Sequence, residues 1–326
     1  MVAKNLYLAA ALVILAACSE NPISTDGTIN TGHSVTGNPI SGAAFWIDPS
    51  SNAKVIANTW RATRPADAAQ LDKIAAGSQA RWFGGWNVNI LDDVSTAVST
   101  AVASSATPIL VAYNIPQRDC GGLSAGGTTV DAYKAWIAAF AGGLAGRTAV
   151  VILEPDALTE TNCLSSADMA TRYSLLQYAV QVLRAQGGVV YLDGGNSSWR
   201  SASDQAARLT RAGVAEADGF ALNVSNFQHT SNSISYGKAI SALVGGKHFV
   251  IDTSRNGLGP TSDNQWCNPP GRALGPASTT STADPLVDAY LWIKAPGESD
   301  GTCNGAPAAG IWWPDYALGL AQRSAL

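Results

Sequence analysis

The 326-residue chain carries 20 basic and 24 acidic side chains, which gives a formal net charge of −4. Such a charge balance leaves no basic stripe for a polyanion, so nucleic acid is not an expected partner. The length is enough for a single α/β barrel of about 250 residues together with a leader. We therefore predict one catalytic-size domain, which we expect to be monomeric.

The first 18 residues have the pattern of an export signal. Lys4 supplies positive charge, and the apolar run over residues 6–17 is too short for a comfortable membrane span. The segment Leu15-Ala-Ala-Cys18 also resembles the lipobox of bacterial lipoproteins, in which the cysteine is lipidated and becomes the mature N-terminus. We expect a cell-surface or outer-membrane lipoprotein anchored at Cys18, and the alternative is a simple signal peptide on a secreted protein.

Four cysteines remain after Cys18, and in an oxidising compartment this even number permits two disulfides by any of three pairings. They are Cys120, Cys163, Cys267 and Cys303. Their spacing fits no CxxC metal motif, and the three histidines lie far apart in the sequence. A zinc centre therefore has little support.

Residues 19–37 are rich in Ser, Thr, Asn and Gly, which indicates a flexible tether, and the folded domain is expected over 38–326. Short apolar runs then alternate with helix-like stretches. The predicted strands cover residues 43–47, 80–84, 108–113, 148–153, 188–192, 219–224, 248–251 and 289–293. The segments 131–144 and 166–185 have the three- and four-residue apolar spacing of amphipathic helices. This β/α alternation predicts a parallel barrel or wound sheet.

Several predicted strands lead directly into acidic side chains. These acids are Asp119, Glu154, Asp156, Asp193, Asp252, Glu298 and Asp300. In a β/α barrel the C-terminal strand ends form the active face, so acids from separate strands can meet around one cleft. Any single acid is better explained as a helix cap or an ion-pair partner, whereas the set as a whole indicates a functional cleft.

Clustered carboxyl groups suit glycoside hydrolysis, because crowding raises the pKa of one acid, which can then donate a proton, while its neighbours stay ionised. Tryptophans near the strand ends strengthen a sugar-binding interpretation, since their flat apolar faces can stack on pyranose rings. Trp46, Trp199 and Trp266 flank strand ends and are the expected platforms. Trp82 and Trp292 lie within strand-like runs and suit the core equally well.

Five motifs, in this order along the chain, resemble glycoside hydrolase family 6, the inverting cellulases. They are Tyr113-Asn-Ile-Pro-Gln-Arg-Asp-Cys120, Val151-Ile-Leu-Glu-Pro-Asp-Ala-Leu158, Tyr191-Leu-Asp-Gly-Gly-Asn-Ser-Ser-Trp199, Gly219-Phe-Ala-Leu-Asn-Val-Ser-Asn226 and Trp292-Ile-Lys-Ala-Pro-Gly-Glu-Ser-Asp-Gly301. The resemblance extends from about residue 37 to the C-terminus. It implies a distorted, incompletely closed parallel β/α barrel with an open substrate cleft, and it requires no metal or organic cofactor.

The resemblance also implies roles for individual residues. Asp156 matches the proton donor, and Asp119 matches the neighbouring acid that raises the donor's pKa and helps to relay a proton from the hydrolytic water. Asp300 matches the acid often proposed as general base, acting directly or through a water chain. The residues expected to bind the sugar are Tyr113, Asp193, Asn223, Asn226, Lys294 and Glu298, with stacking by Trp46, Trp199 and Trp266. The implied disulfides are Cys120 with Cys163 and Cys267 with Cys303.

The implied reaction is a single displacement with inversion at the anomeric carbon. The segments after the later strands are short, which leaves little sequence for tunnel-forming loops and favours internal cutting of cellulose or a related β-glucan. A cellobiohydrolase of the same family is the first alternative. The second is a non-catalytic glucan-binding surface lipoprotein, against which the three acids argue, because ionised carboxylates around an uncharged sugar cost desolvation energy.

Overall fold

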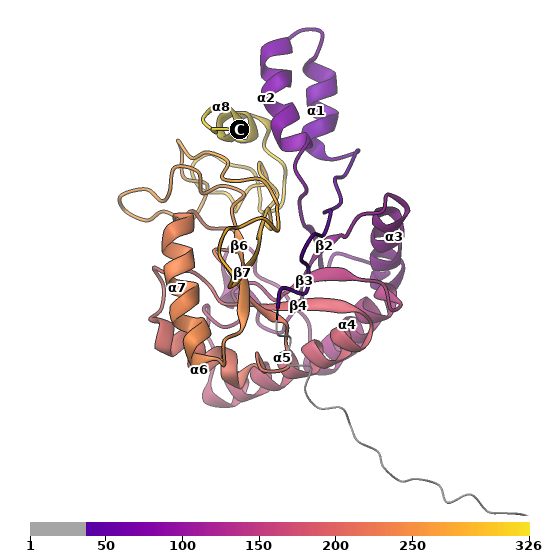
Figure 1. Cartoon of the computed structure of the whole chain (residues 1–326), viewed down its shortest axis with the longest axis vertical. Helices are drawn as coiled ribbons and strands as arrows, with labels where there is room; N and C mark the ends of the chain where they lie inside the picture. Colours follow the sequence, from indigo (N-terminus) through magenta and orange to yellow (C-terminus); the bar gives the residue numbers. More distant parts are fainter. Residues whose placement is uncertain (1–36) are drawn as a thin grey trace, which may run out of the picture. The chain divides into compact units, whose positions relative to one another are not determined.

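Seven parallel strands form one curled sheet in the computed structural model, which describes residues 37–326 (Figure 1). Each strand pairs only with its neighbours in sequence, in the order β1 to β7. The strands are β1 Arg81–Gly84, β2 Ile109–Tyr113, β3 Ala149–Leu153, β4 Gly188–Asp193, β5 Gly219–Leu222, β6 His248–Asp252 and β7 Val287–Leu291. The sheet is the distorted, incompletely closed parallel barrel that the sequence predicts.

The predicted leader over residues 1–18, with its lipidation site at Cys18, lies outside the described residues, as does the predicted tether up to residue 36. None of the helices in the described part of the chain is both long enough and apolar enough to span a membrane.

Alternate residues of the strands pack into two different cores, because successive side chains of a strand point to opposite faces. On β3, Val151 and Leu153 join the core between the sheet and the surrounding helices, whereas Val150 and Ile152 join the core inside the barrel. All five residues of β2 and all five of β3 are buried. Burial on both faces explains why these strands are continuous apolar runs.

Helices follow most of the strands and cover the outside of the sheet (Figure 1). The helices are α1 Asn52–Trp60, α2 Pro65–Ala75, α3 Ile90–Ala103, α4 Val130–Leu144, α5 Ser166–Ala185, α6 Ala202–Arg211, α7 Thr230–Leu243 and α8 Pro314–Gln322, with a 3-10 turn η1 at Asp119–Gly121. Thr129 caps α4 and Ser165 caps α5 by accepting backbone N–H bonds. The two helices predicted from apolar spacing are thus confirmed.

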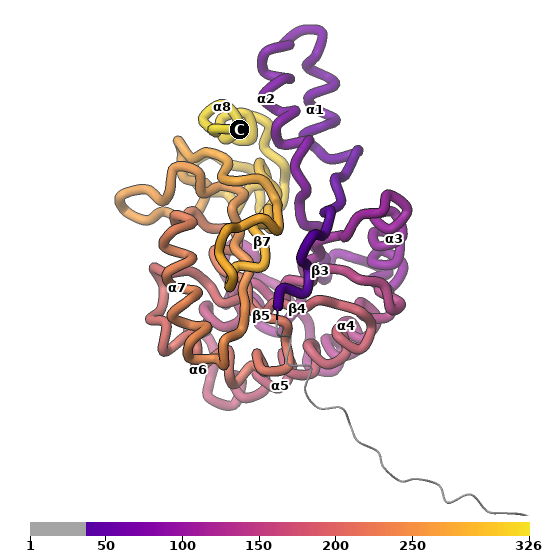
Figure 2. Tube along the Cα trace, viewed as in Figure 1, coloured from indigo at the N-terminus to yellow at the C-terminus, as the bar shows by residue number. Residues whose placement is uncertain are grey.

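Helices α1, α2 and α8 pack together at one end of the molecule (Figure 2). Their shared core includes Leu71, Ile74, Leu320 and the fully buried Trp292. Trp292 therefore belongs to the core, one of the two places that the sequence left open for it.

The first and last strands do not pair along a ladder. A single parallel bridge joins Gln79 to Trp292, with the Ala80 N–H donating to the Trp292 carbonyl at 2.9 Å. The Trp82 indole N–H adds a bond of 2.8 Å to the Ile293 carbonyl. Beyond these contacts the sheet edge of β1 is separate from that of β7, so the barrel is not closed.

The strand predicted at residues 43–47 is absent from the sheet, and that prediction was wrong. Only Phe45 forms a parallel bridge, to Thr107, next to a bond from the Trp46 N–H to the Thr107 carbonyl. The chain then turns at Asp48, whose side chain accepts the Ser50 N–H at 2.8 Å. Since this turn leads into α1, the apolar run has no length over which to pair.

Candidate active site

The two acids that follow β3 have different surroundings. Glu154 is fully buried and accepts the backbone N–H groups of Asn114 and Ile115, at 2.9 and 3.0 Å. It therefore ties the end of β3 to the end of β2. Asp156 remains half-buried, and its pKa is raised well above the ordinary value by burial and then by the charges of Asp193 and Asp119.

Asp193, at the end of β4, supports Asp156 directly. Its Oδ2 accepts the Asp156 backbone N–H at 2.9 Å. The carboxyl is buried, and burial raises its pKa, while this hydrogen bond acts in the opposite direction. The charge of this neighbouring acid is one of the causes of the raised Asp156 pKa.

Asp119 lies on the loop after β2. One of its carboxylate oxygens accepts the Ser124 N–H at 2.7 Å, and the side chain is half-buried. The loop is held by Arg118, which donates to the carbonyls of Tyr113 at 2.7 Å and Ser124 at 2.9 Å. The same guanidinium lies over the Tyr113 ring at 4.4 Å. Sequence reasoning did not assign Arg118 a role.

Asp119, Glu154 and Asp156 all have positive φ angles, of 56°, 51° and 67°. Residues with a Cβ rarely adopt this backbone, and it persists only where the surrounding structure fixes it. The hydrogen bonds to Glu154 and Asp193 and the loop contacts of Arg118 provide that fixing.

Tyr113 places an aromatic ring beside these acids. Its pKa is raised by burial and then by the charges of Asp156 and Asp119. Trp82 packs edge-on against it, with 5.3 Å between ring centroids. Trp82, which the sequence left between core and sugar platform, is thus half-buried next to Tyr113.

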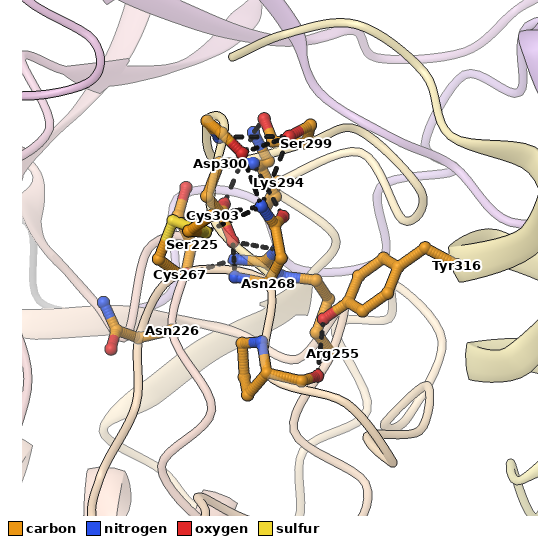
Figure 3. A network of polar contacts seen from close by, with 12 residues as sticks. Ser225, Asn226, Arg255, Cys267, Asn268, Lys294, Ser299, Asp300, Cys303 and Tyr316 are labelled. Atoms are coloured by element: carbon orange, nitrogen blue, oxygen red, sulfur yellow. Dashed lines mark hydrogen bonds and ion pairs between the residues drawn. A yellow bond between two sulfur atoms is a disulfide. The ribbon is translucent and has the colours of Figure 1, made fainter. Parts of the chain in front are cut away.

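Asp300 lies in a dense polar network between the ends of β6 and β7 (Figure 3). Its Oδ2 accepts from Arg255 Nη1 at 2.8 Å and from the Asn268 N–H at 3.0 Å. Lys294 Nζ lies 3.7 Å from its Oδ1. Arg255 is fully buried and also donates to the Ser225 carbonyl. The side chain of Asp300 is therefore held in place by a buried guanidinium and a backbone N–H group.

Lys294 and Glu298 lie on the same loop as Asp300. Lys294 donates to the Ser299 carbonyl at 3.2 Å, and its ammonium lies 5.9 Å from the centroid of the Trp82 ring. Burial raises the pKa of Glu298, and the positive charge of Lys294 opposes that rise. The structure thus brings these two predicted residues to the region of Asp300.

Asn223 is placed differently from its predicted role in sugar binding. Its side chain is fully buried, and it donates to the Asp252 carbonyl at 2.9 Å and accepts the Gln228 N–H at 3.0 Å. Such a side chain holds the chain after β5 against the end of β6, and the structure gives it no sugar-facing surface. Asn226 lies beside the Asp300 network (Figure 3).

The predicted stacking tryptophans keep accessible surface. Trp266 is 48% exposed, and Trp46 and Trp199 are half-buried. Trp86, on the segment after β1, is 55% exposed, and the Arg118 guanidinium lies over its ring at 5.4 Å. Trp86 is therefore a further aromatic surface next to the loop that carries Asp119.

Both disulfides implied by the resemblance are present. Cys120 pairs with Cys163 across 43 residues, and Cys267 pairs with Cys303 across 36. The first joins the loop of Asp119 to the segment after Asp156, and the second lies next to Asp300. Two disulfides fit an exported protein.

We expect the double change Cys120→Ser and Cys163→Ser to lower the free energy of unfolding by about 2–5 kcal/mol, because the unfolded chain gains the freedom of the opened loop. Urea unfolding followed by tryptophan fluorescence measures the change. A midpoint equal to that of the unchanged protein would contradict the expectation.

The loops that carry Asp119 and Asp300 contact each other. A Cβ placed on Gly301 would lie 2.6 Å from the Leu123 side chain, and Gly301 has a φ of +144°. Because Gly301 lacks that atom, Leu123 packs against its backbone. Two surface pockets lie elsewhere, one lined by Tyr173 and Arg208 and the other by Phe45 and Ser78.

The buried acids make stability depend on pH. Burial raises the pKa of Glu154 from 4.5 to about 7, and the pKa values of Asp156 and Asp193 move in the same direction. At a pH between the unfolded and the folded pKa values of these acids, the folded protein holds protons that the unfolded chain has released. The contribution of these protons to the free energy of unfolding is fully present below the unfolded pKa values. It is lost as the pH rises through the folded pKa values.

We therefore expect the urea midpoint to be lower at pH 8 than at pH 5, and the difference to shrink in Asp193→Asn, which removes one of the shifted groups. A midpoint that rises from pH 5 to pH 8 would show that other titrating groups determine the pH dependence of stability, and it would contradict this expectation.

Comparison with known proteins agrees with this geometry. The model of glycosyl hydrolases family 6 matches residues 40–324. Endoglucanase A of Cellulomonas fimi is 44% identical over 289 residues, which cover 88% of this chain and 62% of that protein. Endoglucanase 1 of Streptomyces halstedii is 44% identical over 287 residues, which cover 84% of this chain and 87% of that protein.

A solved structure shows the same architecture. The endoglucanase Cel6 from Mycobacterium tuberculosis, in complex with methyl-cellobiosyl-4-deoxy-4-thio-β-D-cellobioside, superposes with a TM-score of 0.84. The two sequences are 46% identical, and the superposed residues cover 88% of this chain and 99% of the Mycobacterium tuberculosis chain.

Proposed function

We propose that this chain, which belongs to glycosyl hydrolases family 6, hydrolyses internal β-1,4-glucosidic bonds of cellulose or a related β-glucan. The single observation that carries the proposal is the placement of the half-buried Asp156 against Asp193 and near Asp119, where burial and the charges of these two acids raise its pKa. The relatives named endoglucanase support internal cutting, although this chain spans only 62% of the length of Endoglucanase A from Cellulomonas fimi.

The proposed reaction is a single displacement. The Asp156 carboxyl donates its proton to the leaving glycosidic oxygen as the bond from that oxygen to the anomeric carbon breaks. A water molecule attacks the opposite face of the sugar, forms the new carbon–oxygen bond and releases one proton. The configuration at the anomeric carbon is thereby inverted.

Asp119 and Asp300 differ in how well they suit the proton from that water. Asp300 is buried, and its Oδ2 already accepts two hydrogen bonds, one of them from the buried Arg255, so little of this side chain is open to that water. Asp119 accepts one backbone N–H and is partly exposed. We therefore assign the relay of this proton to Asp119 through water, and we assign Asp300 a supporting role.

The sugar contacts that we propose surround these acids. Tyr113 lies beside the acids, and Lys294 and Glu298 supply polar groups. Asp193 and Asn226 lie at strand ends of the same face, and the stacking surfaces come from Trp46, Trp199 and Trp266. Of the predicted set, Asn223 is the member to which we assign a structural role instead.

The viscosity of carboxymethylcellulose tests internal cutting. We expect viscosity to fall early, while few reducing ends have formed, because each internal cut shortens the polymer strongly. A slow fall in viscosity with cellobiose as the dominant product would favour the cellobiohydrolase alternative. Binding of the polymer with no new reducing ends would favour the glucan-binding alternative.

Attachment to a membrane through lipidated Cys18 is the localisation that we propose. The Leu-Ala-Ala-Cys segment and the two disulfides support export. Mass spectrometry of protein made in a bacterial host is expected to show a diacylglycerol on Cys18, and Cys18→Ser is expected to abolish it. An unmodified Cys18, or cleavage at another site, would support a freely secreted enzyme.

A further inference from the structure

A cluster of arginines surrounds the turn that follows Asp156. The Asp156 carbonyl accepts the N–H groups of Thr159 and Glu160, at 3.0 and 2.8 Å. The chain therefore coils like the last turn of a helix. In such a turn the carbonyls of the final residues have no partner within the turn itself.

Three arginines supply the missing partners. Arg172 donates to the carbonyls of Ala157 and Glu160, at 3.1 and 3.3 Å. Arg208 donates to the Leu158 carbonyl at 3.2 Å, and Arg200 donates to the Thr159 carbonyl at 2.7 Å. Four consecutive carbonyls, those of residues 157–160, thus receive guanidinium hydrogen bonds.

Arg172 also reaches the second acid-bearing loop. Its Nη2 donates to the carbonyls of Pro116 and Gln117, at 2.7 and 3.0 Å, three and two residues before Asp119. Arg172 comes from α5 and is buried. One rigid, planar side chain therefore links the loop of Asp119 to the turn of Asp156 through four backbone bonds.

We infer that Arg172 is a positioning residue that fixes Asp156 and Asp119 relative to each other, and that Arg208 helps it to hold the turn of Asp156. The inference rests on the proposed role of Asp156 as proton donor. Neither arginine needs to touch the sugar, because each acts on the backbone that carries an acid. A displacement of about 1 Å at a reacting group can cost about a hundredfold in rate.

Arg172→Lys is the informative change, because it keeps the positive charge, whereas a single ammonium cannot span four carbonyls on two segments. The two substrates are cellohexaose, whose leaving group needs a proton, and 2,4-dinitrophenyl β-cellobioside, whose leaving group departs without one. We expect the variant's kcat on cellohexaose to fall by about 10- to 100-fold with little change in KM.

The decisive quantity is the ratio of kcat on cellohexaose to kcat on the dinitrophenyl substrate. A misplaced proton donor is expected to lower this ratio by the same factor of about 10 to 100, since only cellohexaose depends on the donor. General loss of structure lowers both rates together and leaves the ratio unchanged. A folded Arg172→Lys enzyme with the ratio of the unchanged protein would overturn the inference.

Arg147→Lys is the matched control. Arg147 also donates to backbone carbonyls, those of Gly143 at 2.6 Å and Leu144 at 2.9 Å, but it lies before β3, at the opposite end of the barrel. We expect this variant to keep the ratio of the unchanged protein even where its thermal midpoint falls. A reduced ratio here would mean that the assay reports stability, and it would count against the inference.

Arg208→Lys decides the question if Arg172→Lys does not fold. Arg208 is 20% exposed, so its replacement is better tolerated, and it contacts the turn of Asp156 through Leu158. A lowered ratio supports positioning, and an unchanged ratio overturns it. If the unchanged protein cleaves neither substrate, the proposed function fails instead, so the two failures are distinguishable.

Discussion

Asp156→Asn is expected to lower kcat on cellohexaose by about a thousandfold, within the 10²–10⁴ range that general acid catalysis contributes. The amide has the shape of the carboxyl but cannot give up a proton to the leaving oxygen. The fall is expected in kcat, with the affinity for cellohexaose retained, because the substitution leaves the sugar contacts in place. Steady-state kinetics and calorimetric binding on the same preparation measure both quantities.

The dinitrophenyl substrate serves as the internal control for this variant. Its leaving group needs no proton, so Asp156→Asn is expected to cleave it at a rate much closer to that of the unchanged protein. Equal losses on both substrates would remove Asp156 from the role of proton donor. Unaltered turnover of cellohexaose would remove it from the active site altogether.

The second large effect is expected at Arg255, whose loss leaves the buried Asp300 with only the more distant Lys294 ammonium as counter-charge. Arg255→Leu is expected to lower the free energy of unfolding by about 3–5 kcal/mol, the usual cost of breaking a buried ion pair from one side. The fully buried guanidinium lies 2.8 Å from Asp300 Oδ2 and 4.4 Å from the centroid of the Phe227 ring. Urea unfolding at pH 7 measures the change.

Arg61→Leu is the control for Arg255→Leu. Arg61 also pairs with an aspartate, Asp72, at 3.0 Å, but its side chain is 51% exposed. Since water screens such a pair, the urea midpoint is expected to stay close to that of the unchanged protein. Similar losses in the two variants would contradict the claim that the Asp300 network depends on its burial.

The strand ends and their acids were predictable because the signal is local. A buried parallel strand is a short apolar run, and the chain at its C-terminal end lies at the active face, so Asp119, Asp156 and Asp193 could be placed from their neighbours in sequence. Local pattern also explains the failure at residues 43–47. An apolar run of that length predicts a strand, but only the tertiary structure shows whether a partner strand pairs along it.

The arginines were missed because their roles depend on contacts far apart in sequence. Arg172 lies within a helical segment four residues after Asp168, which by itself indicates an exposed charged face. Its bonds to Pro116 and Gln117 span more than 50 residues. The ion pair of Arg255 with Asp300 and the bonds of Glu154 to the backbone after β2 also depend on burial. Burial of these side chains follows from the assembled barrel and has no local sequence pattern.

The most direct test of the central claim is proton NMR of cellohexaose during the first minutes of reaction with protein lacking residues 1–18. Single displacement with Asp156 as donor predicts that the new reducing ends appear first as the α-anomer and then mutarotate to the equilibrium mixture. Initial formation of the β-anomer would show a double displacement through a covalent intermediate. That result would contradict the mechanism proposed for this arrangement of acids.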